Sequence, residues 1–90
     1  MRRITSFTRP AVDMKATGKR IKLLRLAGRL SVRDLQGVFG FEYPQAVYAW
    51  VCGRSLPTVD NLLVLSELFG VPIDEIVVRK YPGAGEVLSA

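Results

Sequence analysis

The chain has 90 residues, which is enough for one hydrophobic core and too few for two domains. Apolar residues make up 49% and charged residues 23%, so the composition is that of a globular protein and excludes a chain that is disordered throughout. One cysteine and no histidine exclude an internal disulfide, the usual zinc ligands and the commonest general base. The sequence also has neither a membrane-spanning apolar run nor a secretory signal.

Enzyme chemistry finds no support in the residue types. The chain lacks a glycine-rich phosphate loop, paired carboxylates at inward helical spacing and an activated cysteine. We therefore expect a protein of the reducing cytoplasm that is not an enzyme. We expect no cofactor, no metal, no membrane and no small-molecule ligand.

The charge is distributed unevenly along the chain. Residues 1–29 contain nine Lys and Arg and a single Asp, whereas residues 30–90 contain four basic and seven acidic residues. A basic segment on a neutral-to-acidic body favours a polyanionic partner, nucleic acid first and an anionic membrane surface second. The alternative is that these charges only solubilise one helix face.

The first half of the chain predicts an arm and two helices. Residues 1–13 have no periodicity and form a basic arm. Asp13 is a candidate N-cap for a helix over 14–28, in which Gly18 makes the first turn the weakest part. Ser31, with Asp34 three positions later, predicts a capping box at the start of a helix over 31–38.

The second half predicts three more helices. Pro44 is suited to the first position of a helix over 44–52, and Thr58 caps a helix over 58–69. A short last helix follows at 73–77, and residues 79–90 form a loose tail. Since no segment alternates with the period of a strand, we expect an all-α bundle of five helices, with a globular domain over 14–78.

The spacing of these segments resembles that of a known family. Two short helices joined by a turn that contains glycine, the second with a core Trp, form a helix-turn-helix arrangement. In that context the chain resembles the phage-repressor/Cro-like (XRE) family. The stretches that carry the resemblance are Ile21–Arg25, Leu30–Leu35, Gln45–Trp50, Gly53–Pro57 and Asp60–Ile76.

The resemblance implies a lambda-repressor-like DNA-binding domain whose third helix enters the major groove of double-stranded DNA. The function it implies is that of a transcriptional repressor that acts by occupying an operator, so we expect the protein to be associated with the nucleoid. The base-reading positions it implies are Tyr43, Pro44, Gln45 and Ala49. Those at the DNA backbone are Val32, Arg33, Arg54 and Ser55, and the arm adds Arg2, Arg3 and Arg9 as a tether or a solubilising tail. Gln45 has the donor and acceptor that pair with adenine.

Some residues leave two interpretations open. The helix over 44–52 contains no Lys or Arg, and this favours a protein-interaction module, such as an antitoxin or anti-regulator, as the second candidate function. Trp50 is expected in the core, and Cys52 is expected to be a small packing residue rather than a redox sensor. Tyr48 is either exposed filler or a contact residue. Val51 stands where the family often has Glu, so Arg25 is expected to face solvent or DNA.

Assembly is the last expectation. One recognition helix reads only a few base pairs, so we expect a homodimer on two half-sites about 34 Å apart. The apolar residues proposed for the contact are Ile73, Ile76, Val77 and Val78. The alternative is that Ile73 and Ile76 only close the core.

Overall fold

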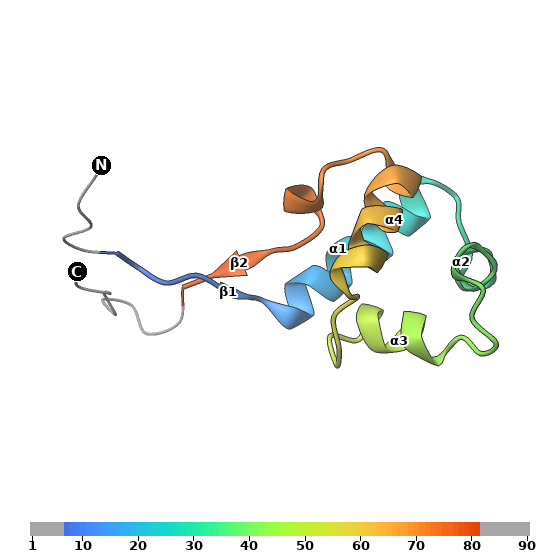
Figure 1. Cartoon of the computed structure of the whole chain (residues 1–90), viewed down its shortest axis with the longest axis horizontal. Coiled ribbons are helices and arrows are strands. Elements are labelled where there is room, and N and C mark those ends of the chain that lie inside the picture. The colour runs from blue at the N-terminus through green and yellow to red at the C-terminus, as the bar shows by residue number, and fades with distance from the viewer. Residues whose placement is uncertain (1–6, 82–90) are drawn as a thin grey trace.

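The computed structural model describes residues 7–81, which form four α-helices, one 3-10 helix and a two-stranded antiparallel ribbon (Figure 1). In chain order the elements are β1 (Ala11–Val12), α1 (Met14–Ala27), α2 (Val32–Phe39), α3 (Gln45–Val51), α4 (Val59–Phe69), η1 (Ile73–Glu75) and β2 (Arg79–Lys80). The helices predicted at 14–28, 31–38, 44–52 and 58–69 are confirmed, with ends that differ by one residue at most. None of the described helices is both long and apolar enough to cross a membrane.

The prediction of a fifth helix over 73–77 is wrong, because only the short η1 forms there. Its helical bonds end where the Ile76 and Val77 N–H groups both donate to the Ile73 carbonyl. The next residue, Val78, makes both of its backbone bonds with the start of α1: its N–H donates to Thr17 Oγ1, and its carbonyl accepts from the Asp13 N–H. These long-range bonds hold the chain extended and end the helix.

The ribbon corrects the expectation of an all-α chain. Ala11 pairs with Lys80 and Val12 with Arg79, so the end of the segment assigned to the arm lies beside the start of the segment assigned to the tail. Each strand has two residues, which is too short to show alternation in the sequence. In Figure 1 the ribbon projects from the helical body, so the two ends of the described chain lie on the same side of the molecule.

The predicted N-caps are confirmed at three helices. Asp13 accepts from the Ala16 N–H at 3.0 Å, and Thr58 accepts from the Asn61 N–H at 3.2 Å. At α2 the Asp34 N–H donates to Ser31 Oγ at 2.9 Å while the Ser31 N–H donates to Asp34 Oδ2 at 2.8 Å, which completes the capping box. Side-chain oxygens thus satisfy backbone donors that a helix leaves free at its first turn.

The core is formed by residues of the four α-helices and by Ile76, which follows η1. Its fully or almost fully buried hydrophobic residues are Ile21, Leu35, Val47, Trp50, Leu65 and Ile76. Trp50 is therefore in the core, as predicted, and the rings of Phe39 and Phe41 pack edge-on against it with centroids 5.2 and 5.8 Å away. This aromatic group attaches the turn between α2 and α3 to the rest of the domain.

Candidate nucleic-acid interface

Helices α2 and α3 form a helix-turn-helix whose turn is held by both its backbone and a side chain. In Figure 1 α2 is seen end-on while α3 runs across the view, so the two axes cross steeply. Gly40 ends α2 in the left-handed conformation, with φ of 68°. The amide of Gln36 then donates to the carbonyls of Phe41 and Glu42, at 3.2 and 3.1 Å. Nothing in the sequence points to this role of Gln36, because a half-buried amide in a helix has no pattern of its own.

The outward face of α3 presents two of the predicted base-reading residues, Gln45 and Ala49, together with Tyr48. Gln45 is exposed and Ala49, one turn later, is half-buried on the same face. Tyr48 lies beside them and is 49% exposed, which makes it a member of this face rather than part of the core. We call Gln45, Tyr48 and Ala49 the α3 face.

The other two predicted base-reading residues lie at the start of α3. Tyr43, in the turn, is 62% exposed, and Pro44 is half-buried at the N-cap position. Glu42 is exposed next to them and is the nearest acidic residue in sequence to the α3 face. The start of α3 therefore combines an aromatic hydroxyl, an apolar ring and a carboxylate.

Cys52 corrects one expectation. It is the C-cap residue of α3 and is exposed, so it is not the small packing residue that the sequence analysis favoured. Residues at spacings of three and four share a side of a helix, and Cys52 comes four residues after Tyr48 and three after Ala49. Its thiol therefore continues the α3 face by one position.

The residues predicted at the DNA backbone lie at the two ends of the helix-turn-helix. Arg33 is exposed in the first turn of α2, whereas the side chain of Val32 beside it packs against the core. Arg54 and Ser55 are exposed just past α3, where both of their N–H groups donate to the Ala49 carbonyl, at 2.9 and 3.4 Å. The three polar side chains are thus free to contact a ligand, and Val32 offers only its backbone.

The arm is described only in part. Arg9 is exposed, and Arg2 and Arg3 lie outside the described residues.

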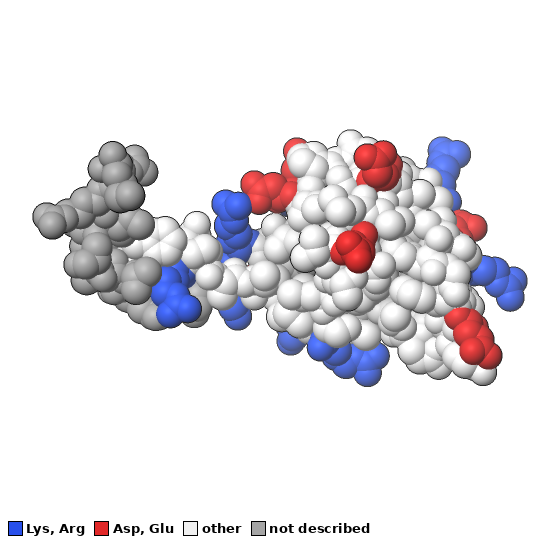
Figure 2. Space-filling model, in the orientation of Figure 1, with Lys and Arg blue, Asp and Glu red and all other residues white. Residues whose placement is uncertain are grey.

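Charge separates the faces of the molecule. α3 carries no charged residue, whereas α1 carries five basic residues and no acidic one. Figure 2 shows acidic side chains on the face that α4 crosses in Figure 1, and both acidic and basic side chains at its rim. A polyanion would therefore avoid the α4 face.

Arg25 is half-buried, contrary to the expectation that it faces solvent or DNA. Its Nη1 donates to the Leu30 carbonyl at 2.8 Å, which braces the turn between α1 and α2. Its Nε is buried and has no hydrogen-bond partner among the described residues.

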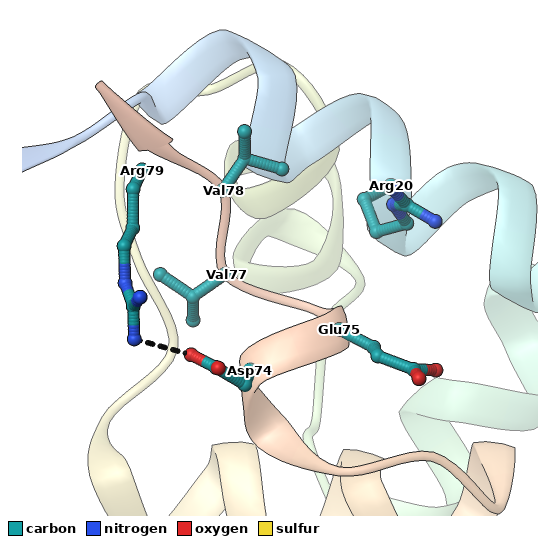
Figure 3. A pocket seen from close by; sticks show the side chains of 6 residues that line it. All are labelled: Arg20, Asp74, Glu75, Val77, Val78 and Arg79. Atoms are coloured by element: carbon teal, nitrogen blue, oxygen red, sulfur yellow. Dashed lines mark hydrogen bonds and ion pairs between the residues drawn. The ribbon is translucent and has the colours of Figure 1, made fainter.

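The residues proposed for a dimer contact differ in exposure. Ile76 is completely buried, so it closes the core and is not available for a dimer contact. Ile73, Val77 and Val78 are half-buried. A pocket of about 270 Å³ lies beside Val77 and Val78 (Figure 3). Its charges come from Arg20 on α1 and from Asp74, Glu75 and Arg79, and the Arg79 guanidinium donates to Asp74 Oδ1 at 2.7 Å.

Together, these helices and their turn define a helix-turn-helix fold. No family model matches the chain, and no curated protein matches it in sequence. Two solved structures share its fold. The BldD DNA-binding domain of S. venezulae is 23% identical, with a TM-score of 0.60 over 72% of this chain and 96% of that chain. A crystal structure of the DNA-binding domain of BldD is 24% identical, with a TM-score of 0.61 over 72% of this chain and 93% of that chain.

Proposed function

We propose that the protein is a sequence-specific DNA-binding transcriptional regulator of the phage-repressor/Cro-like type, which represses by occupying an operator. The observation that carries the proposal is the α3 face: an exposed helix surface with Gln45 and Tyr48 outward, supported from behind by the buried Val47 and Trp50. The likeness in fold to two DNA-binding domains supports the same assignment. A helix held in this way is suited to insertion into a major groove.

The proposed contacts divide into base reading and phosphate binding. Gln45 is the principal base reader, because its amide can donate to and accept from an adenine edge at once. Tyr43 and Tyr48 add hydroxyl groups, while Pro44 and Ala49 offer apolar contact to a thymine methyl. Arg33, Arg54 and Ser55 would bind phosphates at the two ends of the helix-turn-helix, with Arg2, Arg3 and Arg9 of the arm in addition.

We also propose that the protein binds DNA as a homodimer. Ile73, Val77 and Val78 are half-buried and leave apolar surface next to the ribbon. Ile73 and Val77 line a hollow of about 290 Å³ together with Pro10 and Val12. Symmetric pairing doubles the number of base pairs that are read.

A protein-interaction module is the second candidate function. The observation that favours it is that α3 has no Lys or Arg and that Glu42, at its start, is exposed. A carboxylate there would repel phosphate, and two exposed tyrosines are typical of protein interfaces.

Selection of bound fragments from a random duplex library, followed by mobility-shift titration of the winning site and of a shuffled duplex, tests the proposal. We expect a palindromic winner that binds at least about a thousandfold more tightly than the shuffled duplex. If no sequence is enriched and neither duplex is retarded at low salt, the DNA-binding proposal is wrong and the interaction module takes its place.

A further inference from the structure

Three lysines form one exposed stripe along α1. Lys15, Lys19 and Lys22 are spaced by four and three residues, which places them on the same side of the helix, and all three are exposed. We call these three residues the lysine stripe. Along the helix axis it is about 10 Å long, at about 1.5 Å per residue.

The stripe begins beside the end of α3. A Cβ atom on Gly53 would lie 3.0 Å from the Lys15 Cα, so the chain just past α3 passes directly against the first turn of α1. A Cβ on Gly18 would lie 2.5 Å from the carbonyl oxygens of Trp50 and Val51, so the next turn of α1 presses on the last turn of α3. Arg54 is the residue after Gly53 and is exposed. The lysine stripe therefore begins where α1 packs against the residue before Arg54.

The positive charge of the stripe is not neutralised within the described chain. The ion pair found among residues 7–81 is Arg79–Asp74, which does not involve the stripe. Asp13, the acidic residue nearest to Lys15 in sequence, caps α1 by accepting from the Ala16 N–H. Each lysine thus presents a free ammonium group to solvent.

The stripe does not help α1 to fold. Lys15 lies in the first turn, where the partial positive charge of the helix N-terminus disfavours a cation. Like charges at spacings of three and four also destabilise a helix. A binding partner of opposite charge removes both penalties, so the arrangement favours an anionic ligand that covers the stripe.

We propose that the lysine stripe, together with Arg54, binds the phosphate backbone of DNA beside the groove that α3 enters. This inference rests on the proposed function. Successive phosphates of one strand advance by about 3.4 Å along the duplex axis, so a stripe of about 10 Å matches about three of them. The ammonium groups carry no base-reading pattern, so the contact adds affinity for every sequence and leaves base preference to the α3 face.

The test compares two triple variants of the full chain that lose the same charge. The stripe variant is Lys15→Gln, Lys19→Gln and Lys22→Gln. The matched control is Arg20→Gln, Arg79→Gln and Lys80→Gln, which neutralises three exposed basic residues outside the stripe. Far-UV circular dichroism verifies that both fold, and the affinity of each for a selected site and for a shuffled duplex is measured by fluorescence anisotropy across a salt series.

We expect the stripe variant to bind both duplexes more weakly by the same factor, and its log–log salt slope to be flatter by about 2.7, because each lost phosphate contact removes about 0.9. The control is expected to keep a slope close to that of the wild type. If affinity and salt slope change equally in the two variants, or change in neither, the proposal is wrong while the proposed function stands. A wild-type protein that binds neither duplex would overturn both.

An anionic membrane is the alternative partner for such a stripe. Cosedimentation of the same proteins with phosphatidylserine vesicles separates the two. If the wild type binds the vesicles, and the stripe variant does not bind them but binds DNA as the wild type does, the stripe belongs to a membrane surface and the proposal is wrong.

Discussion

The backbone N–H of Val78 donates to the hydroxyl oxygen of Thr17 at 2.9 Å, across 61 positions of sequence, and Thr17 is completely buried. The partner bond, from the Asp13 N–H to the Val78 carbonyl, is 2.8 Å long. One residue therefore closes the end of the helical body onto the start of α1 and aligns the two strands of the ribbon, which pair directly beyond it.

Replacing the Thr17 hydroxyl should loosen this junction. Thr17→Val keeps the shape and removes the acceptor, so the Val78 N–H loses its partner and the free energy of unfolding should fall by about 1–3 kcal/mol. Hydrogen exchange of the Val78 amide should become faster. Thr17→Ser retains the hydroxyl and should keep that amide protected. Equal protection in the valine and serine variants would show that the bond does not hold the junction.

Two glycines in helices should respond to alanine with opposite signs. A Cβ at Gly18 would meet backbone oxygens of α3 at 2.5 Å, so Gly18→Ala must push α1 away from α3 and should cost about 1–3 kcal/mol. A Cβ at Gly37, in α2, meets nothing within 4 Å, so Gly37→Ala should gain up to about 1 kcal/mol from helix propensity. Urea unfolding of both variants measures the contrast. A stabilised Gly18→Ala protein would contradict the close approach of the two helices.

The capping box should make the stability of the protein depend on pH in the acidic range. The hydrogen bonds from the Ser31 backbone N–H and from its side chain hold the pKa of Asp34 below its ordinary value of 3.8. Because the pKa is lower in the folded state, the stabilisation is complete above the ordinary value and is lost as the pH falls through the folded value.

The variant Asp34→Asn has no carboxylate to titrate at this position. The wild type should therefore lose stability relative to Asp34→Asn as the pH is lowered from about 5 to about 2, as measured by thermal unfolding. A constant difference between the two proteins over that range would show that Asp34 does not titrate differently on folding.

Gln45→Ala should weaken binding to the selected site and not to a shuffled duplex. Loss of a bidentate contact to adenine should cost about 1–3 kcal/mol on the selected site and relax preference at one base position, while binding to a shuffled duplex stays nearly unchanged. Tyr48→Phe serves as the matched variant on the same face, since it removes a hydroxyl group alone. If Gln45→Ala leaves the base preference unchanged and Tyr48→Phe changes it, Tyr48 is the base-reading residue and Gln45 is not.

Dimer formation should be visible in sedimentation of the operator complex. We expect two protomers per palindromic duplex, and we expect Val77→Asp to reduce this to one, because a carboxylate in the half-buried patch cannot be covered without loss of solvation. Val38→Asp, at an exposed residue of α2, is the control and should leave the stoichiometry at two. One wild-type protomer at saturation would exclude the dimer.

The four α-helices and their caps could be predicted from local signals. Asp13, Ser31 and Thr58 each carry a side-chain oxygen that can reach a free N–H of the first turn, and this preference operates within three or four residues. The position of Trp50 in the core and the outward position of Gln45 follow equally from helical periodicity. Local physical chemistry is sufficient for these features because their partners are near in sequence.

Other features depend on partners that are far apart in sequence, and only the tertiary structure decided them. From the local sequence, Gly18 is only a residue of low helix propensity in α1. In the structure, the absence of a side chain at Gly18 allows the backbone of α3 to approach. The segment 73–77 has the pattern of a helix, but the bonds of Val78 to Thr17 and Asp13 pull the chain into a ribbon. The backbone of Lys15 lies against Gly53, the residue before Arg54, although 38 positions separate Lys15 from Gly53 in the sequence. The sequence by itself determined the four α-helices and the apolar side of each, because those signals are local. Contacts between distant segments decided where the last helical turn ends and how closely α1 and α3 approach.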